Sequence, residues 1–336
     1  GGGWDGDRDR GSGAIGSRAA ASGGRPWARP ERGPGRPRGG DAAACGRSGE
    51  RMPDHPVIDA HVHLYDPGAL PYGWLRGDPV LDRPHGLAEL DHAAGAVAIE
   101  RLVFVEVAVD AGRHREEARR IQALADRDPR VAAIVAHAPL ERGAAVEAEL
   151  DELQELPALL GIRRLIQDEA DPAFCLEPGF VEGVRRAGAR GLVVELCLRA
   201  GRSQLGPATE LVRRCPEVRF VLDHLGKPPV ATGALEPWRS ELSELARCSN
   251  VVCKISGLIT EADPERWSRA GLRPWLEHAF SCFGAERTLY GSDWPVSART
   301  HLYTTWVAIL DEFLAAASPA ERERFWRGTA REVYRI

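Results

Sequence analysis

Short apolar runs alternate with longer amphipathic stretches along the chain from residue 57 onward. The runs are rich in Val, Ile and Leu, as buried strands of a parallel sheet are, and the stretches between them are longer and more polar. This alternation predicts βαβ units, in which a helix connects each strand to the next parallel strand. The eight apolar runs are residues 57–64, 101–107, 131–137, 161–166, 191–198, 218–225, 250–258 and 287–294.

Two of the stretches between these runs show clear helical signals. In residues 113–127, apolar side chains recur at helical spacing. Residues 177–191 have Pro178 near their start and Gly191 at their end, which are residues typical of helix starts and stops. Eight strands joined by such helices predict an α/β fold, a (β/α)₈ TIM barrel. An open doubly wound sheet is the alternative fold.

The first 51 residues differ in composition from the rest. Residues 1–50 hold 15 of the 36 glycines, and residues 1–51 hold ten arginines and no apolar run. Such a segment cannot bury enough apolar surface to offset its ordering entropy, so we expect a disordered Gly/Arg-rich extension at 1–51 and one barrel domain at 52–336. Met52, the only methionine, is the expected translation start. A targeting or RNA-binding role for the extension is the alternative.

The overall composition suits a globular enzyme that acts on a small molecule. The net charge is −5 and 43% of the residues are hydrophobic, so no nucleic-acid partner is expected. No apolar stretch reaches 18 residues, so no membrane span is expected. Seven cysteines lie scattered without a CxxC spacing, which predicts reduced thiols and a cytoplasmic location. A homo-oligomer is compatible with these features.

Histidine and aspartate residues end three of the predicted strands. His61 and His63 close the first run, His224 closes the sixth and Asp293 closes the eighth. Side chains alternate along a strand, so both imidazoles of an H-x-H pair point to one side and can chelate one metal ion. Barrel active sites lie at the C-terminal ends of the strands. The alternatives without a catalytic role are that H-x-H is a pair of half-buried polar residues capping a strand, and that Asp293 caps the following helix.

The chain contains five characteristic segments in this order: VIDAHVHL, GIRRLIQDE, FVLDHLGKPP, NVVCKISGLITEAD and LYGSDWPV. Through these segments it resembles the amidohydrolase-related lactonases, which include sugar-acid lactonases and 2-pyrone-4,6-dicarboxylate lactonase. The resemblance covers residues 56–334 and implies a distorted, amidohydrolase-like barrel with His61, His63, His224 and Asp293 at the reaction centre. It further implies a hydrolase that opens a lactone ring, and the GIRR and DHLGKP segments favour sugar-acid lactones.

One departure from the superfamily pattern concerns metal binding. Metal-dependent members usually have a histidine on strand five and often a carboxylated lysine or a glutamate on strand four. Here strand five offers Glu195 and Cys197, and strand four offers Arg163 and Arg164. We therefore expect no binuclear centre but at most one divalent ion, zinc or manganese, and metal-independent catalysis stays an alternative. The expected metal ligands are His61, His63 and Asp293.

The remaining candidates have roles that ester hydrolysis requires. Asp293 is the expected base, assisted by His224, and Arg163 is the expected cation near the carbonyl or a substrate carboxylate. A structural ion pair is the alternative for Arg163. His137 and Glu106 also lie near strand ends, and Lys254 within strand seven is a candidate buried ion-pair partner. The expected substrate-binding residues are Gln167, Trp74, Lys227 and Trp294.

Two other functions fit the same residues. A non-oxidative decarboxylase of an aromatic or pyrone acid could use a similar H-x-H and Asp arrangement. A non-catalytic barrel that binds a small ligand is a third interpretation, which the presence of all four candidate residues disfavours.

Overall fold

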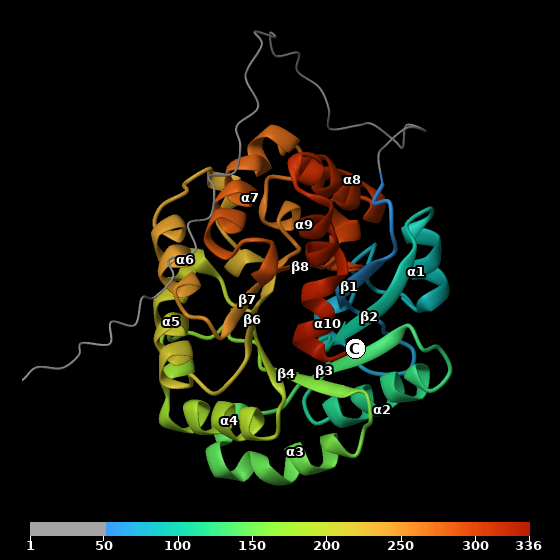
Figure 1. The fold of residues 1–336 in the computed structure, drawn as a ribbon. Helices are drawn as coiled ribbons and strands as arrows, with labels where there is room; N and C mark the ends of the chain where they lie inside the picture. Colours follow the sequence, from blue (N-terminus) through green and yellow to red (C-terminus); the bar gives the residue numbers. More distant parts are fainter. Residues whose placement is uncertain (1–51) are drawn as a thin grey trace, which may run out of the picture. The chain divides into compact units, whose positions relative to one another are not determined.

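A computed structural model describes residues 52–336, and the predictions for residues 1–51, including Cys45, lie outside this part of the chain. Eight parallel strands pair in the order of the sequence (Figure 1). This order confirms the predicted barrel, since a doubly wound sheet would reverse its strand order. The strands are β1 (Val57–Val62), β2 (Ile99–Val105), β3 (Val131–Ala136), β4 (Leu159–Arg163), β5 (Val193–Leu196), β6 (Phe220–Leu222), β7 (Val251–Ile255) and β8 (Thr288–Tyr290).

The seam between β8 and β1 is joined just beyond the ends of both strands. The amide of Asp293 donates to the carbonyl of His61 at 3.0 Å, and the amide of His63 donates to the carbonyl of Trp294 at 2.9 Å. The barrel is therefore distorted, and its seam is joined by the backbone of the residues that the sequence marks as catalytic.

Helices connect successive strands and surround the sheet (Figure 1). Both helices singled out from the sequence form, as α2 and α4. Gly191 follows α4 with φ +73°, a left-handed conformation that explains the need for glycine there. The helices are α1 (Leu87–Ala94), α2 (His114–Ala125), α3 (Glu147–Gln154), α4 (Pro178–Ala189), α5 (Leu205–Arg214), α6 (Trp238–Ala246), α7 (Arg269–Phe283), α8 (Tyr303–Phe313), α9 (Pro319–Glu323) and α10 (Thr329–Tyr334).

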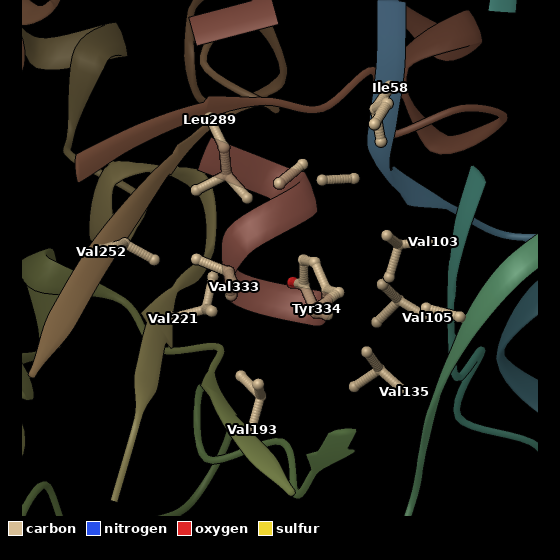
Figure 2. Packing of buried hydrophobic residues seen from close by; sticks show 13 residues of the cluster. Ile58, Val103, Val105, Val135, Val193, Val221, Val252, Leu289, Val333 and Tyr334 are labelled. Carbon is tan, nitrogen blue, oxygen red and sulfur yellow. The ribbon is translucent and has the colours of Figure 1, made fainter. Parts of the chain in front are cut away.

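The interior of the barrel is filled by strand residues and by α10. Figure 2 shows Tyr334 surrounded by apolar side chains from strands around the barrel. Ala330 and Val333 of α10 join the same cluster. The barrel is thus a packed core rather than a pore, and the last helix supplies part of the packing. The strand residues of the cluster are Ile58, Ala60, Val103, Val105, Ala133, Val135, Val193, Val221, Val252 and Leu289.

A charged layer lies directly on this apolar layer. Three strands carry a valine of the apolar cluster and, two positions later, a charged residue: Glu195, Asp223 and Lys254. Residues two apart in a strand point to the same side, so these groups also face the barrel interior. All three are buried. The charged layer therefore separates the apolar core from the predicted site.

Within residues 52–336, no helix has the length and apolar character that a bilayer span would require. The six cysteines of this part of the chain are free, as expected for reduced thiols.

Candidate active site

Three histidines gather around one carboxylate oxygen. Oδ1 of Asp293 lies 3.7 Å from Nε2 of His61, 3.5 Å from Nε2 of His63 and 3.9 Å from Nε2 of His224. All four side chains are buried. The structure thus brings together the residues that end strands one, six and eight in the sequence.

Hydrogen bonding orients His63 within this group. Nδ1 of His63 lies 2.8 Å from the carbonyl of Val105 on β2, and a carbonyl only accepts, so Nδ1 carries the proton of the neutral ring. Nε2 then presents a lone pair toward Asp293. A lone pair 3.5 Å from a carboxylate oxygen has the spacing of two ligand atoms of one metal ion.

His224 and Asp293 are held in left-handed backbone conformations. Their φ angles are +52° and +60°, and Leu225 and Lys227 also have positive φ. Such conformations are uncommon for residues other than glycine and are concentrated at functional sites. They turn the chain sharply at the end of β6 and after β8, so that both side chains point into the barrel mouth.

Two residues that directly follow β7, Ser256 and Gly257, fix His224. Oγ of Ser256 lies 2.8 Å from Nδ1 of His224. A Cβ atom at Gly257, whose φ is +58°, would lie 2.7 Å from Nδ1 of His224 and 3.1 Å from Oδ2 of Asp293. The absence of a side chain at Gly257 therefore lets the histidine and the aspartate approach each other.

Asp59 supports the site from β1. Its Oδ1 accepts from the amide of Ser292 at 2.8 Å and from that of His61 at 3.2 Å, and its Oδ2 accepts from the hydroxyl of Tyr303 at 2.9 Å. Burial raises the pKa of Asp59 to about 6, against the lowering effect of these hydrogen bonds. Asp59 thus ties the end of β1 to the loop that carries Asp293.

The electrostatics of the cluster lower the pKa of the aspartate and of two of the histidines. Burial alone would raise the pKa of Asp293, but His224 and His63 outweigh it and hold the pKa below its ordinary value. Burial lowers the pKa of His224 well below its usual range, and the pKa of His61 is lowered by burial and by Lys254. A carboxylate and neutral imidazoles are the forms that can accept a proton.

Arg163 lies beside the cluster with most of its donors engaged. Nε donates to Oε1 of Glu106 at 2.8 Å, Nη2 donates to the Glu106 carbonyl at 2.6 Å, and Nη1 lies 3.2 Å from Oδ2 of Asp223. Nη1 also lies 3.4 Å from Nε2 of His61. The structural ion pair that the sequence left open is present, and a direct contact between Arg163 and substrate stays a prediction.

The predicted substrate-binding residues fall into different settings. Nζ of Lys227 donates to Oε1 of Gln167 at 2.5 Å, so these two lie together. Trp74 is 47% exposed and donates to the carbonyl of Val107 at 2.8 Å. Trp294 is 4% exposed and its ring packs edge-on against His85, with the ring centroids 5.2 Å apart. Trp294 is thus buried beside His85, and its contact with a substrate stays a prediction.

The secondary candidates also find partners. His137 packs against the ring of His114, with centroids 5.0 Å apart. Lys254 is a buried ion-pair partner, as predicted, with Nζ 2.6 Å from Oε2 of Glu195. Sequence reasoning assigned no role to Asp59, Ser256 or Gly257. Asp59 did carry a signal, because it precedes His61 by the same two-residue step that separates the two histidines.

The donor atoms fit a single divalent ion. Tetrahedral zinc with ligands at 2.0–2.1 Å needs ligand atoms roughly 3.3 Å apart, and the distances from Asp293 to the three histidines are 3.5 to 3.9 Å. His61, His224 and Asp293 form one of the groups of side chains whose spacing suits a metal. Oδ1 of Asp223 lies 3.4 Å from Nδ1 of His61 without a hydrogen bond between them, among the described residues.

Comparisons with known proteins identify relatives over nearly the whole described chain. Residues 58–336 match the protein family described as Amidohydrolase. An L-fucono-1,5-lactonase from Burkholderia multivorans is 34% identical over 294 residues, which cover 83% of this chain and 96% of the relative. A solved amidohydrolase structure from the same organism, with bound zinc, is 33% identical with a TM-score of 0.75 and covers 84% of this chain and all of that one.

The decarboxylase alternative finds only a distant likeness. The 5-carboxyvanillate decarboxylase of Sphingomonas paucimobilis is 16% identical with a TM-score of 0.58, covering 84% of this chain and 99% of the other. Such a likeness shows the shared fold alone. The family match, together with a lactonase relative that aligns over most of both chains, overturns the interpretation as a non-catalytic barrel. The chain belongs to the amidohydrolase family and is a hydrolase.

Proposed function

We propose that this protein hydrolyses a lactone, and that the lactone is the cyclic ester of a sugar acid. The observation that carries the proposal is the group of three imidazole Nε2 atoms around Oδ1 of Asp293. The relative named L-fucono-1,5-lactonase supports the substrate class, because it shares 34% identity over most of both chains.

Asp293 acts as the general base in this proposal. Opening a lactone requires an activated water molecule, stabilisation of an oxyanion and a proton for the departing alkoxide. Asp293 accepts a proton from water, since its pKa is lowered and it is ionised near neutral pH. The unprotonated Nε2 of His63 accepts the second hydrogen of that water and so directs its oxygen toward the carbonyl.

The oxygens of the substrate need cationic donors, and in the proposal Lys227 supplies one. Lys227 follows His224 by three residues at the end of β6, and its backbone amide donates to the carbonyl of His224 at 2.8 Å. In the proposal Lys227 and Gln167 bind hydroxyl or carbonyl oxygens of the substrate, while Arg163 positions the ring of His61. The protonated Asp293 returns its proton to the alkoxide when the ring opens.

A zinc or manganese ion would be held by His61, His63 and Asp293, with His224 as a further ligand. Such an ion would supply a bound water of lowered pKa and polarise the lactone carbonyl. The guanidinium of Arg163, 3.4 Å from Nε2 of His61, adds a positive charge next to that position. This charge opposes metal binding at that position, and the steps above use the chain's own residues alone.

The experiment that tests the proposal measures acid release by the full chain from a panel of sugar-acid lactones. Parallel samples are treated with a chelator and then supplied with zinc or manganese. Turnover that survives the chelator supports the route through side chains alone, and turnover that returns only with metal supports a metal-dependent lactonase. No acid release from any lactone, together with CO₂ release from an aromatic acid, would replace the proposal by the decarboxylase.

The proposal also covers the cellular location of the enzyme and its partners. Free cysteines suit a reducing compartment, so we propose a cytoplasmic location. The net charge of −5 supports a small-molecule substrate rather than a nucleic acid as the partner. A homo-oligomer stays a prediction.

A further inference from the structure

Lys254 lies at the centre of the charged layer, beneath the proposed reaction centre. Its Nζ is 2.6 Å from Oε2 of Glu195, 3.2 Å from Oδ1 of Asp223 and 3.2 Å from Nδ1 of His61. All four side chains are fully or almost fully buried. The ammonium group is therefore enclosed by two carboxylates and an imidazole and has no access to solvent.

The three groups around this ammonium form a set of metal ligands. Ligand atoms of His61, Glu195 and Asp223 lie within 4.8 Å of one another, and an imidazole with two carboxylates is a common donor set for divalent ions. Oδ1 of Asp223 has no hydrogen-bond partner among residues 52–336, so its contact with Lys254 is electrostatic. This oxygen is the type of acceptor that a metal ion would ligate.

The apolar core closes the cluster from below. The hydroxyl of Tyr334 donates to Oε1 of Glu195, and the ammonium of Lys254 lies 5.8 Å from the centre of the Tyr334 ring. Arg163 contacts the other oxygen of Asp223 at 3.2 Å. Two buried carboxylates thus face two buried cations, and removal of Lys254 would leave a net negative cluster in a water-poor interior.

We propose that Lys254 occupies a latent divalent-cation site formed by His61, Glu195 and Asp223. The side chain supplies a permanent, tethered cation where a second metal ion would otherwise bind, so the barrel has at most one exchangeable ion. The contact distances of 2.6 to 3.2 Å are those of an ammonium ion, longer than the roughly 2.0–2.3 Å of zinc ligands. The inference concerns the cation content of the barrel and does not depend on the proposed substrate.

The test replaces Lys254 by alanine in the full chain and measures bound metal. Wild type and Lys254→Ala are dialysed against cobalt or zinc, and the ions per chain are determined by elemental analysis. Cobalt bound by carboxylates and imidazole also gives an absorption spectrum that is independent of enzymatic activity. The expected result is one more ion per chain in Lys254→Ala than in wild type, together with a higher melting temperature when metal is added.

Two double variants locate the additional ion. Lys254→Ala with Glu195→Gln removes a ligand of the latent site, and the additional ion should be lost. Lys254→Ala with Asp293→Asn disturbs the reaction centre instead, and the additional ion should remain. The opposite pattern would mean that Lys254 only weakened binding at the reaction centre, and it would overturn the proposal.

The proposal stays testable if Lys254→Ala folds poorly. Its refolding yield is then compared with and without cobalt or zinc, and the yield should rise only with metal. Lys254→Met is the matched control, because it fills the same volume without charge and should gain no ion. A folded Lys254→Ala protein with the metal content of wild type, or one whose refolding ignores metal, would refute the latent site.

Discussion

Ser256 and His224 form a hydrogen bond between neighbouring strand ends, with Oγ of Ser256 2.8 Å from Nδ1 of His224. The bond fixes the plane of the imidazole and leaves its Nε2 on the side of Asp293. Ser256 itself is buried and does not reach the reaction centre, so it acts through the histidine.

Ser256→Ala is expected to lower kcat by roughly tenfold, the equivalent of ~1.4 kcal/mol, with little change in KM. The imidazole loses its orienting partner while the substrate pocket keeps its shape. Steady-state kinetics on the substrate found by the lactone panel measure the effect. Ser243→Ala is the control, since Ser243 contacts His278 at 3.2 Å on the outer helices. Equal losses in both variants would contradict an orienting role.

Asp293→Asn is expected to reduce kcat by about 10²–10⁴-fold, the usual contribution of a general base. Asparagine has the shape of aspartate and tolerates the left-handed conformation at φ +60°, so the melting temperature should hardly change. The kcat and the melting temperature are measured on the same preparation of the variant. A variant with near-normal turnover would exclude Asp293 as the base.

Gly257→Ala is expected to lose most activity, because a Cβ there would lie 2.7 Å from the ring of His224 and force it away from Asp293. A positive φ also strains any alanine, so stability should fall by about 1–2 kcal/mol. Gly284→Ala provides the matched control, since Gly284 has φ +66° and nothing within 4 Å of the new Cβ. It should lose similar stability and keep its activity; if it also lost activity, strain alone would explain Gly257→Ala.

Stability is expected to fall as the pH rises toward 8, through Glu117 of α2. Burial and the nearby charge of Glu106 raise the pKa of Glu117 from 4.5 to about 8. Below pH 4.5 the carboxyl is protonated in both states and contributes nothing to the pH dependence. Between pH 4.5 and 8 the unfolded chain releases its proton and the folded chain retains it, which favours unfolding.

Glu117→Gln removes this titration, so the variant should gain stability relative to wild type between pH 5 and 8. Each pH unit between the two pKa values is worth about 1.4 kcal/mol, and the expected gain is ~2–5 kcal/mol. Denaturant unfolding of both proteins at pH 5 and at pH 8 measures this difference in the free energy of unfolding. A constant difference between variant and wild type would show that the buried carboxyl does not titrate in this range.

The sequence predicts the barrel because its signals are local and repeated. Each strand is a short apolar run, and each helix has its own periodicity, so the element order follows without knowledge of distant contacts. The histidines and Asp293 are predictable for the same reason, since they end their strands and barrel sites form at that end.

The charged layer could not be predicted in this way. Glu195, Asp223 and Lys254 come from three strands, and their pairing depends on which residues share a level inside the barrel. Strand boundaries that are uncertain by one residue reverse the direction of a side chain. The packing of Tyr334 inside the barrel could not be predicted either, because helical periodicity does not tell whether a helix lies outside the barrel or within it.

Because Tyr334 packs among strands that precede it in the chain, the interior of the barrel cannot be filled before α10 has been synthesised. Every strand leaves the ribosome before α10 does, and until then the ring of strands encloses unfilled space lined by valines. An incomplete barrel exposes apolar surface and unpaired charge to the solvent, and exposed apolar surface promotes aggregation. Docking of residues 329–334 is therefore the step that fills the interior of the strand ring.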